Sequence, residues 1–465
     1  MLGLFNDILG YILMAVLALC GIWFTIRTKG VQFRMVGEMF RLLKDKPADR
    51  TKGTPAVKSA ISSFQAFAVS VATRVGTGNL AGVATAIAIA GPGSVFWMWV
   101  MALLGSATAF VESTLAQLYK RRHKGAFIGG PAYYITHGLH SKPLAYVFAV
   151  LITLTFGLSY NSIQSNTICD AMEHAFGWSP IVVGLILAAV SLFIVFGGIH
   201  RIAVISTVLV PIMAVGYLVL VLVIMAMNWQ LIPHVFKIIV TDAFGIGPAI
   251  GGTVGSVIIY GAKRGLFSNE AGVGSAPNAA ATAEVSHPVK QGLIQSLGVF
   301  TDTLLVCSCT AFIILISGLY DHPSVSGIEL VQVSLSREVG SFGPYFIAIA
   351  ILLFAFSSIV GNYYYGEVNI RYMTENKAVM TVYRLCSAGV MVMFGAMVSL
   401  DLTWTIGDIC TVLLAFCNLI AVVVLGKYAF RLLDDYVKQK KQGIQDPLFR
   451  RSQMPEIEEN IDCWA

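Results

Sequence analysis

The sequence predicts an all-helical integral membrane protein with eleven transmembrane helices, and three observations lead to this fold class. Hydrophobic residues make up 56% of the 465 residues and charged residues only 12%, about half the charged fraction of a soluble domain. Apolar runs of about 20 residues, the length that crosses a bilayer as a helix, recur along the chain. Two of these runs contain clusters of glycine. A porin-type barrel is excluded, because its strands alternate in polarity and give no such runs.

The eleven predicted spans are separated by short polar segments, and residues 27–58 form a basic, partly amphipathic segment that we expect on the membrane surface. The spans are Leu4–Ile26, Ala60–Ala90, Val95–Tyr119, Pro143–Asp170, Ile181–Phe196, Ile202–Met227, Phe244–Arg264, Val289–Ser317, Tyr345–Tyr365, Val379–Leu400 and Ile406–Phe430.

The two glycine clusters divide the chain. We assign residues 1–58 to an extra N-terminal helix with its amphipathic segment, 59–228 to a first five-helix repeat, 229–430 to a second, and 431–465 to a cytoplasmic tail. The clusters fall in the first helix of each repeat, helices 2 and 7 of the chain. Corresponding interruptions in two halves are typical of inverted-repeat transporters.

The basic residues predict the orientation. With the N-terminus outside, all but three of the 31 Lys and Arg residues fall on the cytoplasmic side, the exceptions being Arg74, Lys237 and Arg337. Cytoplasmic loops carry this excess in membrane proteins. The net charge of +6 therefore reflects membrane topology and not nucleic-acid binding. We expect a multi-pass protein of the cell membrane, embedded in the lipid bilayer, with its C-terminus in the cytoplasm.

The first interruption is Arg74-Val75-Gly76-Thr77-Gly78-Asn79. Placing an arginine at the bilayer centre costs about 2.5–3.5 kcal/mol of insertion free energy. Irregular backbone is tolerated inside a membrane where it lines a cavity, so we expect this segment to line one. Free N–H groups at 76–79, with the dipole of the following half-helix, suit a carboxylate. The carbonyls of Ala72 and Val75 point the other way and suit Na⁺. The alternative is a glycine packing face between helices.

The second interruption is predicted from distance. If Lys263 and Arg264 lie at the cytoplasmic surface, ten residues of helix place the midplane near Val254, between Gly251 and Gly255. Free carbonyls there would accept a substrate ammonium group. The glycine-rich segment 265–277 is not a phosphate-binding loop, because it lacks the GxxxxGK[ST] pattern. We interpret it as a cytoplasmic gate, and a deeper placement would make it the break itself.

Other polar residues lie within the spans. Phe354, Ser357 and Ser358 offer one carbonyl and two hydroxyls, which are hard ligands for Na⁺, although the hydroxyls could instead bond to carbonyls one turn back. A tilted fourth span would bring Gln164 near the cavity, unless it only bonds between helices. Glu112 and Asp302 are candidates for a proton path or for partners of Arg74.

The chain resembles the alanine/glycine:cation symporter family. The resemblance rests on segments in order along nearly the whole chain: Val-Gly-Thr-Gly-Asn-Leu-Ala-Gly around Gly76, Gly-Pro-Ala-Tyr-Tyr at 130–134, Arg-Gly-Leu-Phe-Ser-Asn-Glu-Ala-Gly at 264–272, and the run 355–367. It implies a LeuT-type fold of five plus five helices with one added helix, coupling to Na⁺ or, alternatively, H⁺, small neutral amino acid substrates, and a prokaryotic inner membrane.

The same resemblance implies roles for particular residues. Thr77 and Gly78 would hold the substrate carboxylate, with Gly76 and Asn79 beside them, and Gln164 would assist. The sodium site would consist of Ala72, Val75, Phe354, Ser357 and Ser358. Many members have Gly-Trp where this chain has Gly361-Asn362. An amide opens and polarises the pocket, so glutamine or serine becomes an alternative to alanine and glycine.

Two other function classes are disfavoured. A channel would need a pore-lining ring repeated over several subunits, whereas one asymmetric chain carries both interruptions. A membrane enzyme would need a nucleophile–base or metal constellation, which the sequence lacks, and we expect no cofactor other than Na⁺ as coupling ion. The eight cysteines form no CxxC pair.

The orientation leads to a labelling prediction. Cysteines introduced at Ser141 and Lys440 should react with membrane-impermeant reagents only from the cytoplasmic side, because both positions lie in basic loops. Labelling of intact cells and of inverted vesicles measures this. Reaction of either position from outside would contradict the eleven-span topology.

Overall fold

The protein is a bundle of long helices, seen in a computed structural model that describes residues 2–45, 61–123, 125–246, 253–320, 325–398 and 400–464. The first part of the chain forms α1 (Leu2–Arg27), α2 (Val31–Arg34), α3 (Val36–Leu42), α4 (Ser63–Arg74), η1 (Gly78–Gly82), α5 (Val83–Ala90), α6 (Ser94–Leu118), α7 (Pro131–Gly138), α8 (Lys142–Leu154), η2 (Thr155–Tyr160), α9 (Asn161–Phe176), α10 (Pro180–Val195) and α11 (Gly198–Met227).

The second part begins with short segments and ends in the longest helix. It contains η3 (Trp229–Leu231), α12 (Ile232–Ala243), α13 (Val254–Asn269), α14 (Ala276–Ala280), α15 (Val289–Val299), η4 (Phe300–Cys307), α16 (Ser308–Ser317), α17 (Gly327–Val339), α18 (Phe342–Met373), α19 (Lys377–Leu385), η5 (Cys386–Val390), α20 (Met391–Met397), α21 (Leu400–Lys441), η6 (Arg451–Gln453) and η7 (Pro455–Asn460). A short hairpin of β1 (Arg121–His123) and β2 (Ala126–Ile128) follows α6.

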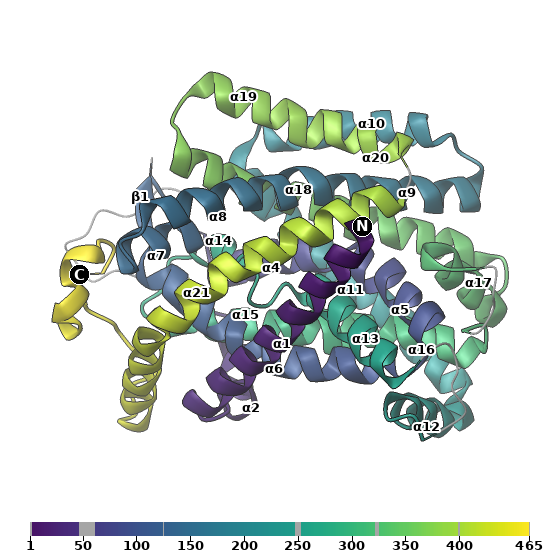
Figure 1. The fold of residues 1–465 in the computed structure, drawn as a ribbon, viewed down its shortest axis with the longest axis horizontal. Helices are drawn as coiled ribbons and strands as arrows, with labels where there is room; N and C mark the ends of the chain where they lie inside the picture. The colour runs from purple at the N-terminus through teal and green to yellow at the C-terminus, as the bar shows by residue number, and fades with distance from the viewer. Residues whose placement is uncertain are drawn as a thin grey trace.

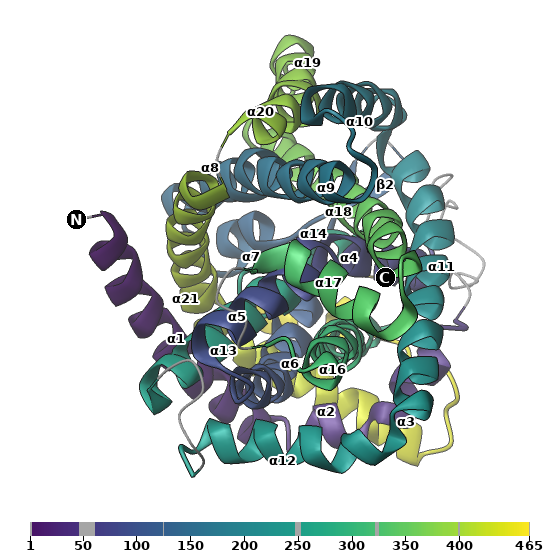
Figure 2. The ribbon, with the colours of Figure 1, turned by 90° about the vertical axis from the view of Figure 1, so that its right-hand side faces the viewer.

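The helices form two packed groups (Figures 1 and 2). In one group, α6 packs against α13, α14 and α15, and α4 packs against α14 and α15. In the other group, α18 packs against α8 and α9, and α10 and α20 lie on the outside of α9. Helix α4 also contacts α18, so the first interruption lies between the two groups.

The outer surface is apolar, as a lipid-facing surface requires. Within the described residues, eight helices are long and apolar enough to cross a membrane, and the apolar helices Gly78–Ala90 and Pro180–Val195 are shorter. Helix α11 is an example, because four of its large hydrophobic side chains are each more than half exposed: Val208, Ile212, Val215 and Val219. The protein is therefore a multi-pass membrane protein.

The predicted elements differ from the observed ones in two places. Helix α13 runs without a break from Val254 to Asn269, past the predicted end of the seventh span at Arg264. The second interruption is the run of turns at 270–275, which lies beyond that predicted span. Gly251 and Gly252 lie outside the described residues, and Gly255 is an exposed residue of the first turn of α13. The predicted tail, 431–465, begins inside α21, which continues to Lys441.

The distance estimate failed because Lys263 and Arg264 are not at an edge of the bundle. Both lie within α13, and each has a partner on α21. The Lys263 ammonium lies 2.7 Å from Asp408 Oδ2, and the Arg264 guanidinium lies 4.3 Å from the centre of the Trp404 ring. Paired basic groups of this kind can remain inside a membrane protein.

Close packing between α20 and α9, within one helix group, leads to a stability prediction. A Cβ added to Gly395 in α20 would lie 2.2 Å from the Ser162 carbonyl oxygen of α9. Gly395→Ala should therefore destabilise the protein by about 1–3 kcal/mol through overpacking. Gly216→Ala in α11 is the control, because a Cβ there meets nothing within 4 Å. Thermal inactivation in detergent should separate the two variants, and equal midpoints would contradict the packing.

Candidate functional site

The first interruption begins where α4 ends. Helix α4 starts with a capping box, in which Ser62 accepts from Gln65 N and Gln65 reaches back to Ser62 N, and it ends at Arg74. Val75 is extended, with φ −81° and ψ 98°, and the next helical segment begins as the π-helix η1 at Gly78. Val75 and Gly76 thus leave the regular helix at a buried position between the two helix groups, and Thr77 already has helical angles, with φ −54° and ψ −36°.

Polar side chains satisfy the freed backbone groups. The Gly76 N–H donates to Asn79 Oδ1 at 2.9 Å. The Thr77 N–H donates to Gln164 Oε1 at 3.0 Å, and the Thr77 hydroxyl donates to the same oxygen at 2.7 Å. The Gln164 amide oxygen therefore occupies the position at which Thr77 would bind one oxygen of a carboxylate. Gln164 is 3% exposed and lies on α9, in the opposite helix group.

The second interruption meets the first one at Asp302. Asn79 Nδ2 donates to Asp302 Oδ1 at 2.7 Å, and Ser268, at the end of α13, donates to Asp302 Oδ2 at 2.7 Å. A Cβ added to Gly78 would lie 2.9 Å from Cδ1 of Phe267 in α13. Gly78 is therefore needed for the approach of α13 to the first break.

The five predicted cation ligands converge. Ser358 Oγ lies 2.9 Å from Ala72 O, 3.3 Å from Val75 O and 3.1 Å from Phe354 O. Ser357 Oγ lies 2.8 Å from Phe354 O and 3.4 Å from Ala72 O. The contacts to Phe354 are the local bonds of a membrane serine, but those to 72 and 75 join two distant helices. Three carbonyls and two hydroxyls in one place form a donor set that suits a hard monovalent cation.

Asn362 lies one turn beyond Ser358 on α18. It is fully buried, and neither atom of its side-chain amide has a hydrogen-bond partner among the described residues. The preceding residue, Gly361, packs directly on α4, because a Cβ there would lie 2.3 Å from Thr73 Cγ2. A buried amide without partners is costly, so its presence beside the site indicates that a ligand could supply them.

Gly255 is the predicted site residue that the structure does not bring to this place. It lies at the exposed end of α13, and the site is formed instead by the other end of that helix. Ser268 and Phe267 are site residues that the sequence analysis did not assign. The sequence feature that points to them is the Ser-Asn-Glu-Ala-Gly segment, which begins at Ser268. The prediction of a cytoplasmic gate for this segment depends on placing Lys263 and Arg264 at the cytoplasmic surface.

Two further buried carboxylates, Glu112 and Glu270, lie close to the second interruption. Glu112 accepts from the Gly272 N–H at 3.2 Å and from Asn418 Nδ2 at 2.8 Å, so it satisfies backbone within the second interruption. Glu270, the first residue after α13, accepts from Ser275 at 2.5 Å. Arg74 donates to the Gln295 carbonyl at 3.3 Å. The Glu112 and Glu270 contacts therefore stabilise the irregular backbone after α13, and the Arg74 contact joins the end of α4 to α15.

Comparison with known proteins gives one family and several relatives. A model described as the sodium:alanine symporter family matches residues 1–451. The chain is 49% identical to the probable sodium/glutamine symporter GlnT of Bacillus subtilis, over 99% of this chain and 95% of the relative. It is 47% identical to the amino-acid carrier protein AlsT of the same organism, over 99% and 96%. It is 37% identical to the sodium/alanine symporter AgcS of Methanococcus maripaludis, over 87% and 90%.

Among solved structures, the chain is similar to a mutant form of a manganese transporter from Eremococcus coleocola. The TM-score is 0.55 at 12% identity, over 84% of this chain and 88% of the other. At this identity the similarity concerns the fold alone, and it shows that the helices are arranged as in a known transporter. The family match, which spans nearly the whole chain, adds the class of function. The chain belongs to the sodium:alanine symporter family, and it is accordingly a membrane transporter and not an enzyme.

Proposed function

We propose that this protein is a sodium-coupled symporter that imports neutral amino acids by alternating access. The observation that carries the proposal is the convergence of five oxygens from α4 and α18 beside the interrupted backbone at 76–78. A cation there would bind both helix groups at once. Its binding would therefore depend on their relative position, which is the requirement for coupling.

The substrate carboxylate would bind at the N–H groups of Thr77 and Gly78. In this proposal the Gln164 side chain moves away from Thr77 when substrate enters. The hydrogen bond between Gly76 and Asn79 preserves the backbone conformation of the interruption. The dipole of the helix that begins at Gly78 favours the negative charge. Alanine is the substrate that the family description and the name of the AgcS relative support, and we include glycine as the smaller neutral amino acid.

Glutamine is the second candidate substrate, and Asn362 favours it. A substrate with a side-chain amide could donate to Asn362 Oδ1 and accept from Nδ2, the two atoms without partners among the described residues. The relative named as a probable sodium/glutamine symporter agrees with this alternative. Serine, with one hydroxyl, could satisfy one of the two atoms.

The proposal includes the finer topology. Eleven helices would cross the membrane as one added helix and two five-helix repeats, with α4–α5 and α13–α14 as the interrupted first helices. The N-terminus would be outside and the C-terminus in the cytoplasm. Under this arrangement α12 and α17 lie at the outer end of the bundle, and α7 and the β1–β2 hairpin lie at the cytoplasmic end.

The cation site leads to the first transport prediction. Ser357→Ala with Ser358→Ala should raise the sodium concentration for half-maximal uptake about tenfold or more, because two ligands of a charged ion are lost. Thr207→Ala is the control, since its hydroxyl donates to Ala203 O of its own helix at 2.9 Å. Uptake of labelled alanine into proteoliposomes measures the change. An unchanged sodium dependence would assign the serine hydroxyls to local helix bonding.

The pocket leads to the second transport prediction. Asn362→Leu and Asn362→Trp should each reduce glutamine relative to alanine by about 10- to 200-fold in competition assays. Asn362→Leu should also keep or raise the thermal stability, because the replaced amide has no partner among the described residues. A loss of stability with unchanged substrate ratio would make Asn362 a packing residue.

A further inference from the structure

The end of the chain folds back on the bundle. After α21 ends at Lys441, residues 444–464, here called the C-terminal clasp, run along the end of the bundle that carries α7 and β1 (Figure 1). Six apolar side chains of the clasp are at most 6% exposed: Phe449, Met454, Ile457, Ile461, Cys463 and Trp464. The clasp is therefore a docked segment and not a solvated tail.

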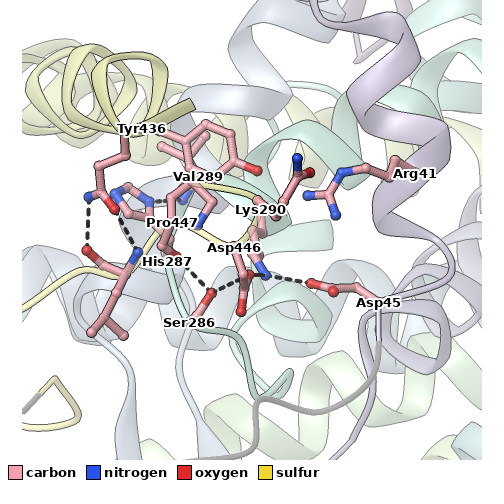
Figure 3. Close-up of polar contacts among 12 residues, drawn as sticks. Arg41, Asp45, Ser286, His287, Val289, Lys290, Tyr436, Asp446 and Pro447 are labelled. Carbon is pink, nitrogen blue, oxygen red and sulfur yellow. Dashed lines mark hydrogen bonds and ion pairs between the residues drawn. The ribbon is translucent and has the colours of Figure 1, made fainter. Parts of the chain in front are cut away.

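The first anchor of the clasp is the linker between α14 and α15. The Phe449 N–H donates to the Ser286 carbonyl at 3.0 Å, and Ser286 Oγ lies 2.8 Å from Pro447 O and 3.0 Å from Asp446 Oδ1. Lys290 forms ion pairs with Asp446 and, at 2.6 Å, with Asp45 (Figure 3). The linker follows α14, the short helix that comes directly after the second interruption.

The second anchor is the end of α6. The Trp464 indole N–H lies 3.2 Å from Gln117 O and 3.1 Å from Leu118 O, carbonyls in the last turn of that helix. Carbonyls in the last turn of a helix have no partner within it, so the indole supplies one. Arg121 donates to Asn460 O at 2.9 Å and pairs with Asp462.

The anchored segments close one end of the bundle. The Glu284 N–H donates to Ile61 O at 3.0 Å, which joins the linker to the segment just before α4. Gln117 Nε2, on α6, donates to Ala280 O at 2.5 Å and to Ala283 O at 3.0 Å. If α4, α6 and α14 move apart at this end, these hydrogen bonds must break. The clasp lies over them on the surface of the bundle.

Lys290 keeps a carboxylate partner when the clasp leaves. Lys290 is 1% exposed, and a buried ammonium group left without any carboxylate partner would be strongly destabilising. It has two carboxylates, however, and the pair with Asp45 does not involve the clasp. The side chain of Asp446 is 58% exposed and returns to water on release. The contact is thus suited to reversible docking.

We propose that the C-terminal clasp is an autoinhibitory latch, which holds this end of the transport pathway closed and must undock before substrate can leave there. The inference rests on the proposed alternating-access function. Docking of residues 444–464 biases the protein toward the state closed at this end, and release shifts the population toward opening. A change of charge or a binding partner at the clasp would then regulate transport without touching the substrate site.

The test uses two buried thiol probes in a chain whose other cysteines are replaced by serine. Cys463 reports the clasp, and Thr282→Cys reports the linker; both positions are 4% exposed, and burial raises the pKa of the Cys463 thiol. With Asp446→Asn and Ser286→Ala combined, maleimide labelling of both probes in inverted vesicles should rise about three- to tenfold. Glu458→Gln, which removes an exposed pair with Arg451 inside the clasp, is the control and should change neither rate.

The two probes separate the possible results. Faster labelling of Cys463 alone would show a loose tail that does not hold the linker, and unchanged labelling of both would show that these contacts do not hold the clasp. Either result would overturn the proposal. Labelling requires no transported substrate, so failure of the proposed function would appear separately, as absent sodium-dependent alanine uptake by the parent.

A cross-link tests the need for release in the otherwise intact chain. Cysteines at Ser286 and Phe449, joined by a short thiol cross-linker with a reducible bond, should stop alanine uptake, and reductant should restore it. Cross-linked protein that transports at the parental rate would overturn the proposal, because transport would then not require release of the clasp.

Discussion

Every backbone N–H and C=O group inside a bilayer needs a partner, and the structure of this protein depends on how it meets that requirement at two places where helices stop. At 75–77 the partners are Asn79 and Gln164. At 270–275 they include Glu112 and Asn418, which bond to Gly272 N and Gly272 O. Polar side chains that would be costly elsewhere in a membrane are therefore explained by the backbone beside them.

The same requirement brings separate helices together. Asp302 accepts from Asn79 after the first interruption and from Ser268 before the second, so the two irregular segments share one partner. Glycines make the approach possible, because a Cβ at Gly76 would lie 2.4 Å from Ser358 Oγ. The result is a compact polar site at the contact between the two helix groups, where a ligand can influence their relative position.

The two ends of the proposed site differ in what they would recognise. Backbone groups and small hydroxyls dominate the carboxylate and cation positions, and such groups bind what all neutral amino acids have in common. Asn362 is a side chain without a partner among the described residues, and in the proposed site it would face the part of the substrate that differs between amino acids. The proposed variation in substrate within a shared coupling mechanism follows from this division.

The sequence by itself determined the membrane class and the first interruption, because apolar run length and helix breakers are local signals. It also singled out Ala72, Val75, Phe354, Ser357 and Ser358 as the proposed cation donors, and the fold brings these five residues together. It did not determine the position of the second interruption. The estimate assumed that Lys263 and Arg264 reach water, whereas partners on α21 retain them inside the bundle. Nor could the sequence show that the charged tail docks through Phe449 and Trp464. Both outcomes depend on contacts between segments more than a hundred residues apart, and only the tertiary structure decides those.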